Sequence, residues 1–346
     1  MLADPAAREH VAKVWGVSLD ELPQPGYSAQ AIMEAIHRGE IKALFSLCFN
    51  PLISLPDANY TREALEKLEF FSVIDFFLSE TAQHADVVLA GSLQEEEEGL
   101  TCNVEGRVIH IQKAVDPPAN ARTDTWILCE VAKRLDREKF FPFRTSREVL
   151  DELREASRGG HADYYGITYE RVDEHMGLFW PCPSLDHPGT PHLFEGGHSF
   201  HPDGKCKFLT TEWRESGDPV DEQYSVYLTT GRVVSQYLSG TQTRRLGGLV
   251  DIYPEPFVEI HPRLALQYGI SDGNAVTITT RRAEITLRAL VTKTIRPDTV
   301  FIPYHWPGKQ SANKLTHRTL DPRSKIPEFK VSACYLRKAS PAEVHG

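Results

Sequence analysis

The sequence predicts an α/β fold joined to a β fold: a helix-covered parallel sheet, followed by a small closed β-barrel. Between residues 43 and 90, short apolar runs alternate with segments of helical periodicity. After residue 224, apolar and polar residues alternate at period two, with tight turns between the runs. The 346 residues are enough for about two or three domains, each with its own core.

The α/β part follows a regular order along the chain. We expect a strand at 43–49, a helix at 61–69, a strand at 70–74, a short helix at 79–84 and a strand at 86–90. This alternation predicts a parallel sheet, and ligands bind beyond the carboxyl ends of the strands in such sheets. Asn50 and Asp75 follow two of these strands, so both are candidates for a binding edge.

The middle of the chain gives weaker signals. A helix is predicted over 123–135, and the four glutamates within 94–99 are typical of a solvated face. Residues 137–217 are rich in proline, glycine and histidine and lack periodicity, which favours an irregular connection. Since the histidines there have no second ligand at a suitable spacing, we expect no metal site.

The β part starts with a strand predicted at 224–229. Alternating apolar residues predict two further strands around 276–280 and 285–291, which flank a turn, and a helix is expected at 262–268. Short alternating strands with regular turns favour a closed barrel. We therefore expect three regions: an α/β domain at 1–136, an irregular connection at 137–220 and a β-barrel at 221–346.

Composition excludes several classes of protein. No stretch approaches the roughly 20 apolar residues of a membrane span, and residues 1–10 lack the apolar core of a secretory signal, so we expect a cytoplasmic protein. A net charge of -10 argues against a nucleic-acid partner. The six cysteines form no short-spaced pair, which disfavours an iron–sulfur or zinc site within this chain.

One stretch indicates ligand binding. Thr230-Gly231-Arg232-Val233, followed by Gly240 to Arg245, combines a glycine turn, hydroxyl groups and three arginines at a strand end. Backbone N–H groups, hydroxyls and arginines together can hold the pyrophosphate of a cofactor. On local sequence alone, a solvated turn beside a surface loop is the favoured interpretation.

Taken in order, the motifs resemble the molybdopterin-dependent oxidoreductases of the dimethyl-sulfoxide-reductase type, and among them the assimilatory nitrate reductases. In the first half the similar motifs are Val73-Ile74-Asp75, Glu80-Thr81, 85–89, Glu98-Gly99 and 103–107. In the second half they are Thr230-Gly231-Arg232, 269–273, 295–297, His305-Trp306, Asn313 and Lys330. The resemblance spans nearly the whole chain and implies a Rossmann-like sheet domain followed by a six-stranded, double-psi-like barrel that binds a molybdopterin dinucleotide.

The resemblance also implies a cofactor, molybdenum bis-molybdopterin guanine dinucleotide. Asp75 would accept N–H donors of the guanine or a ribose hydroxyl, and the Thr230–Ser239 loop would wrap the pyrophosphate and pterin. The expected cofactor-binding residues are Asn50, Asp75, Asp124, Thr230, Gly231, Arg232, Val233, Ser235, Gln236, Ser239, Tyr304, Asn313 and Lys330. In this chain Glu97 stands where many relatives carry a lysine, which puts a cofactor contact there in doubt.

The family's [4Fe–4S] cysteine cluster and its molybdenum ligand have no counterpart in this sequence, so no catalytic or metal-binding residue is assigned. We expect either a piece of a longer enzyme or a subunit that completes a partner carrying the iron–sulfur cluster and the molybdenum ligand, together with an electron-donor protein or domain. The expected activity of the whole is reduction of nitrate to nitrite by oxygen-atom transfer. The alternatives are a formate dehydrogenase of the same architecture and a non-catalytic cofactor-binding remnant.

Overall fold

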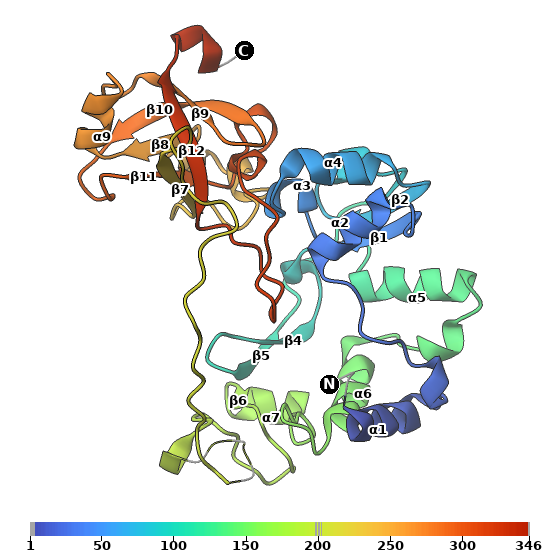
Figure 1. The fold of residues 1–346 in the computed structure, drawn as a ribbon. Coiled ribbons are helices and arrows are strands. Elements are labelled where there is room, and N and C mark those ends of the chain that lie inside the picture. Colours follow the sequence, from blue (N-terminus) through green and yellow to red (C-terminus); the bar gives the residue numbers. More distant parts are fainter. Residues whose placement is uncertain (1–3, 198, 200, 202, 345–346) are drawn as a thin grey trace. The chain divides into compact units, whose positions relative to one another are not determined.

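A computed structural model describes residues 4–197, 199, 201 and 203–344 and divides them between two compact units. The barrel unit consists of Tyr27–Val88 and Glu212–Gly346, and the other unit of Met1–Gly26 and Leu89–Thr211. The first two strands of the α/β segment therefore belong to the same unit as the barrel. Figure 1 labels the helices and strands of both units. The boundaries expected at residues 136 and 220 stay a prediction.

The α/β segment contains the predicted sheet. Its three strands lie in the order β1 (Ala43–Leu47), β2 (Phe70–Asp75) and β3 (Val87–Ala90). Strands β1 and β2 are parallel, with Ala43 opposite Phe70, which confirms the predicted direction for this pair. Helices α2 (Ala29–His37), α3 (Pro51–Ser54) and α4 (Ala58–Glu66) contribute Met33, Ile36, Leu52 and Leu65 to a core with Phe71 and Val73 of β2.

Two helices of this segment differ from the sequence-based expectation. Helix α4 begins at Ala58 rather than 61, because the Asp57 side chain accepts a hydrogen bond from the amide of Tyr60 and caps the helix earlier. The helix expected at 79–84 is a single 3₁₀ turn, Ala82–His84. A segment this short cannot complete the i to i−4 bonds of an α-helix.

The barrel is closed and has six strands in the order β10-β8-β11-β7-β12-β9. They are β7 (Val226–Gly231), β8 (Phe257–Ile260), β9 (Ala275–Thr279), β10 (Glu284–Val291), β11 (Thr299–Pro303) and β12 (Ser332–Lys338), with α8 (Gly247–Val250) and α9 (Pro262–Gln267) between them. The alternating residues of β10 place Ile285, Leu287 and Ala289 in the core, as their period predicts. A closed barrel, six strands and the helix at 262–267 are confirmed.

The other unit is built from an antiparallel sheet and four helices in its described part. The sheet has the order β4 (Gly99–Cys102), β5 (Arg107–Ile111) and β6 (Leu178–Phe179), and the helices are α1 (Pro5–Trp15), α5 (Asp124–Arg134), α6 (Ser146–Ser157) and α7 (Tyr169–Glu174). Helix α5 confirms the prediction at 123–135. The expectation of an irregular 137–217 is wrong for α6 and α7. Helix α6 is amphipathic, with Leu150 buried, and it starts at a Thr145–Glu148 capping box, a local signal that the proline- and glycine-rich composition of the region does not reveal.

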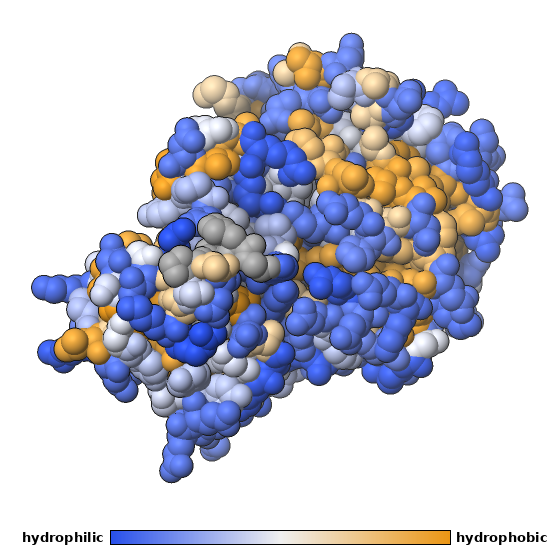
Figure 2. Space-filling view, turned by 90° about the horizontal axis from the view of Figure 1, so that it is seen from above, coloured by the Kyte–Doolittle hydropathy of each residue, from blue (hydrophilic) through white to orange (hydrophobic). Residues whose placement is uncertain are grey.

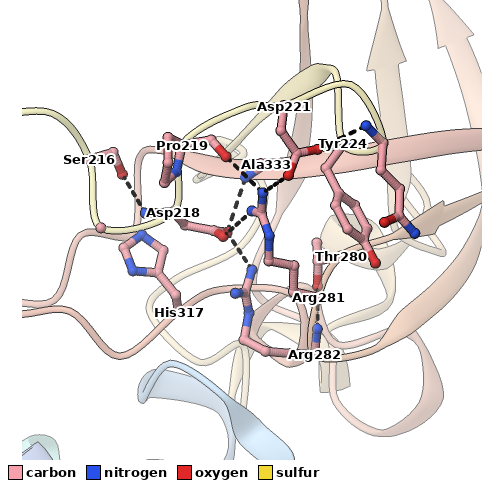
Figure 3. A network of polar contacts seen from close by, with 12 residues as sticks. Ser216, Asp218, Pro219, Asp221, Tyr224, Thr280, Arg281, Arg282, His317 and Ala333 are labelled. Atoms are coloured by element: carbon pink, nitrogen blue, oxygen red, sulfur yellow. Dashed lines mark hydrogen bonds and ion pairs between the residues drawn. The ribbon is translucent and has the colours of Figure 1, made fainter.

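An ion-pair network around the buried Asp218 ties the chain entering the barrel, residues 216–224, to two other segments (Figure 3). Asp218 is 3% exposed, and its carboxylate lies 2.5 Å from Arg281 Nη1 and 2.6 Å from Arg282 Nη2 in the turn between β9 and β10. It also accepts a hydrogen bond from the amide of Ala333 in β12, at 3.1 Å. Arg281 pairs further with Asp221. The network joins the lead-in segment, a hairpin turn and the last strand.

The surface is mostly hydrophilic on the face drawn in Figure 2, with several separate hydrophobic areas. On the sheet, Phe45, Leu47 and Phe70 are each more than two-fifths exposed. Parallel strands are usually buried on both faces, so apolar residues exposed there are unusual. Among the described residues, the helices are all too short or too polar to cross a membrane.

Candidate functional site: a cation-lined cavity in the barrel unit

A cavity of about 660 Å³ lies within the barrel unit. Five parts of the chain meet around it: the segment after β1, the end of β7 with the loop that follows it, the residue after β11, the 3₁₀ turn Ala312–Lys314 and the segment that precedes β12. Its lining residues are Cys48, Phe49, Asn50, Ser54, Thr230, Arg232, Leu238, Ser239, Tyr304, Asn313, Phe329 and Lys330. The structure thus brings together Asn50, Thr230, Arg232, Ser239, Tyr304, Asn313 and Lys330 of the expected cofactor-binding residues.

The end of β7 leaves little room for any residue but glycine. Strand β7 runs parallel to β11, with Gly231 opposite Pro303. A Cβ atom on Gly231 would lie 2.5 Å from the ring of Phe301. The Gly231 carbonyl accepts a hydrogen bond from the amide of Tyr304, so the loop after β7 starts beside the end of β11.

His305 holds that loop in place. It is fully buried; its Nδ1 donates to the carbonyl of Leu238 at 2.5 Å and its Nε2 accepts from the amide of Val233 at 3.0 Å. These two bonds fix one neutral tautomer. Burial, together with the positive charges of Arg232 and Arg244, lowers the pKa of His305 and favours that neutral form. Sequence motifs marked His305-Trp306 but gave no sign of this bridging role.

Two cations face the cavity. Arg232 is exposed, and within the described part of the chain its guanidinium makes no hydrogen bond or ion pair. Lys330 donates from Nζ to the carbonyl of Thr230 at 2.6 Å, which leaves two of its ammonium protons for another acceptor. An unpaired guanidinium beside an ammonium group suits a bound anion, since none of the described residues forms an ion pair with Arg232.

The other two arginines of the loop have different partners. Arg244 donates to Glu80 at 2.8 Å, and Arg245 donates to the carbonyl of Thr241 and lies 4.5 Å from the ring centre of Phe77. Neither lines the cavity. Of the three arginines whose clustering suggests an anion site in the sequence, the structure leaves Arg232 for a ligand and uses the others to anchor the loop.

The amide side chains in the lining are already engaged. Asn50 donates to Glu80 and Thr241 and accepts from the hydroxyl of Thr81 at 2.6 Å. Asn313 donates to the carbonyl of Ile53 at 2.6 Å. Both asparagines thus join the barrel to the α/β segment, and their expected contact with a cofactor stays a prediction.

Buried donors without partners lie in the same loop. Among the described residues, Ser235 Oγ and Gln236 Nε2 are buried and have no hydrogen-bond partner, although Gln236 accepts from Thr243 at 2.7 Å. Buried polar atoms are nearly always paired in folded proteins. Unpartnered donors in the loop that carries Arg232 therefore fit a ligand rich in acceptor oxygens, such as a pyrophosphate.

Gly231, Val233, Ser235 and Gln236 belong to the end of β7 and the loop after it but do not line the cavity. The other two expected residues, Asp75 and Asp124, lie elsewhere. Asp75 is buried at the end of β2, where it accepts from the amide of Phe77, and it does not line the cavity. Asp124 belongs to the other unit and is the first residue of α5. In that unit, burial and the negative charge of Asp124 raise the pKa of Glu97. Two carboxylates therefore lie close together, and one of them, Glu97, stands where the resemblance expects a lysine.

Several lining residues gave no signal in the sequence. Cys48 and Leu238 adopt left-handed backbone angles that L-residues rarely use, and these turn the chain around the cavity. Phe49 and Phe329 contribute apolar walls.

Within the described residues no group of three or more His, Cys, Asp or Glu could hold a metal ion. A second cavity, of about 720 Å³, lies in the other unit around Trp15 and contains none of the expected residues.

The loop geometry predicts a sensitive position at Gly240, which has a φ of 72° and would place a Cβ 2.8 Å from the carbonyl oxygen of His305. Gly240→Ala should lower the free energy of unfolding by about 1–3 kcal/mol, because both the backbone angle and the contact are unfavourable. Urea denaturation measures the effect. Gly248→Ala is the matched control, since a Cβ there meets open space, and an equal loss in both variants would contradict the prediction.

A parallel sheet joined to a closed mixed barrel, with a cation-lined cavity at the strand ends, is an arrangement that suits a large anionic ligand. Residues 5–134 match the family model described as "Molybdopterin oxidoreductase", and residues 226–333 match that of the "Molydopterin dinucleotide binding domain". The chain belongs to the molybdopterin oxidoreductase family.

Two curated relatives agree with this assignment. The chain is 46% identical to the assimilatory nitrate reductase catalytic subunit of Bacillus subtilis (strain 168), over 94% of this chain and 46% of that protein. It is 36% identical to the F420-dependent formate dehydrogenase 1 subunit alpha of Methanococcus maripaludis, over 97% of this chain and 48% of that protein. The chain spans about half the length of the curated relatives it matches.

A solved structure shares the fold. Acetylene hydratase from Pelobacter acetylenicus superposes with a TM-score of 0.73 at 19% sequence identity, covering 96% of this chain and 50% of that one. At this identity the similarity establishes the fold alone.

Proposed function

We propose that this chain is the cofactor-holding part of a molybdenum oxidoreductase that reduces nitrate to nitrite by oxygen-atom transfer. The cavity beside Arg232 and Lys330 carries the proposal, because it lies in the barrel unit whose sequence matches a molybdopterin dinucleotide-binding family. The preference for nitrate follows the 46% identity to an assimilatory nitrate reductase. A double-psi-like strand crossing in the barrel is part of the same proposal.

The residues present fit bis-molybdopterin guanine dinucleotide. Arg232 and Lys330 would neutralise the pyrophosphate, and the unpartnered donors of Ser235 and Gln236 would approach its oxygens or those of the pterin. Asp75, at the end of β2, would hold a guanine edge or a ribose hydroxyl. When bound, the cofactor supplies the molybdenum and its two-electron redox chemistry, while this chain binds and orients it.

The rest of the enzyme would come from a preceding half or a companion subunit. That part would carry the [4Fe–4S] cluster and the molybdenum ligand, and an electron-donor protein or domain would reduce it. The chain's span of about half its relatives' length and the exposed apolar residues Phe45, Leu47 and Phe70 support this proposal.

A reconstitution experiment distinguishes the substrates. The chain is co-produced with the first half of the Bacillus subtilis relative in a host that makes the cofactor, and the complex is assayed with a viologen dye for nitrate reduction and formate oxidation. We expect nitrate reduction alone. Formate oxidation instead would favour the formate dehydrogenase suggested by the 36% identity to the methanogen protein, and neither activity in a molybdenum-loaded complex would favour a non-catalytic remnant.

A further inference from the structure

Glu80 contacts one residue of the cavity wall and one arginine of the adjoining loop. It follows β2, and its side chain is 22% exposed. One carboxylate oxygen accepts from Asn50 Nδ2 and the other from Arg244 Nη2, each at 2.8 Å. Asn50 belongs to the turn after β1 and lines the cavity, whereas Arg244 follows the loop that begins at β7.

The contacts continue from Glu80 to the cavity. Asn50 Nδ2 also approaches Thr241 Oγ1 at 3.3 Å, and Thr241 shares a hydrogen bond of 2.9 Å with the hydroxyl of Ser239, a lining residue. The amide of Arg244 donates to the carbonyl of Gly240 at 2.9 Å, so the arginine is held in the same short turn. A single carboxylate therefore orients a polar chain that ends at the ligand cavity.

The charge on Glu80 is stabilised in this position. Burial alone would raise its pKa, but the hydrogen bonds from Arg244 and Asn50 outweigh burial and hold the pKa below its usual value. An ionised carboxylate accepts on both oxygens, and this is what the two donors require. A glutamine of the same shape presents one acceptor and one donor, so it cannot satisfy both partners.

We infer that Glu80 is a positioning residue for the cofactor cavity: it fixes Asn50 and the 239–244 segment relative to each other, and so keeps the wall around Arg232 in its binding geometry. The inference rests on the proposed function, because it names a residue that organises the same cavity. Preorganised groups bind more tightly, since less ordering remains to be done when the ligand arrives.

Calorimetric titration of the purified 346-residue chain with guanosine diphosphate tests this role, alongside thermal unfolding of each variant. We expect Glu80→Gln to raise the dissociation constant about tenfold, because one charged hydrogen bond is lost. The variant should stay folded at the titration temperature. Arg244→Met should act in the same direction. The double variant should bind guanosine diphosphate about as tightly as the single variant with the lower affinity, because both changes break the same contact.

Glu63→Gln is the matched control, since Glu63 is exposed on α4, away from the cavity. Its affinity should equal that of the wild type. If the wild-type chain binds no guanosine diphosphate, the proposed function fails and the role of Glu80 fails with it. If the wild type binds and Glu80→Gln binds equally well, or changes only the melting temperature, the positioning role alone is overturned.

Discussion

Replacing both Arg232 and Lys330 by alanine is expected to weaken binding of guanosine diphosphate by at least about 100-fold. Each charge-assisted hydrogen bond to a phosphate contributes about 1.5–3 kcal/mol, so the pair accounts for about 3–6 kcal/mol. Arg232 has no competing partner among the described residues, and Lys330 also holds the carbonyl of Thr230. Titration calorimetry at low salt measures the loss directly.

The matched control for that pair is Arg263→Ala with Lys293→Ala. Both residues are exposed on the barrel, and neither lines the cavity. The control removes the same net charge, so a similar loss of affinity would show that only the overall charge matters. Raising the ionic strength should weaken binding to the wild type more than binding to the Arg232/Lys330 variant, since salt screens the charges that the variant lacks.

Replacing Asp218 by alanine is expected to lower the free energy of unfolding by about 3 kcal/mol. The substitution leaves Arg281 and Arg282 without their shared carboxylate and the amide of Ala333 without an acceptor. Arg281 and Arg282 remain partly exposed, so water compensates some of the loss. Urea denaturation followed by circular dichroism measures the change.

Asp251→Ala, at an exposed position after α8, is the control and should change stability little. An unchanged urea midpoint in the Asp218 variant would contradict a stabilising role for the network in Figure 3. Loss of structure confined to the lead-in segment 216–224 would instead show that the network only tethers that segment.

The same carboxylate gives a pH dependence. Burial by itself would raise the pKa of Asp218, but hydrogen bonds from Arg282, the Ala333 amide and Arg281 hold it below its usual value. Because the folded-state pKa is the lower one, the stabilisation is complete above about pH 4 and is lost as the pH falls through the folded-state pKa. The stability difference between the wild type and Asp218→Asn should therefore be constant near neutral pH and shrink in acid.

Strands with a clear local signal were predictable from sequence. An apolar run ended by a turn signal located β1, and the alternation of Ile285, Leu287 and Ala289 located β10. Strand β11 is buried on both faces, so its residues do not alternate, and β8 and β12 pair with strands distant in sequence. Such strands depend on tertiary packing, which local patterns do not encode.

Family motifs marked several residues that the structure brings together. The Thr230 loop, Asn313 and Lys330 meet around one cavity, and their binding of a cofactor stays a prediction. The roles of Arg244, Glu80 and His305 were not accessible, because their partners lie far away in sequence and only the fold brings them together. An arginine that anchors a loop looks the same in sequence as one that binds a phosphate.

The crystal structure of this chain with guanosine diphosphate tests the central claim most directly. We expect the diphosphate in the cavity, within hydrogen-bonding distance of the Arg232 guanidinium and the Lys330 ammonium group, with the loop from Thr230 to Ser239 around it. A nucleotide bound elsewhere, for example in the cavity around Trp15 of the other unit, or no bound nucleotide at saturating concentration, would contradict the assignment of this cavity to the cofactor.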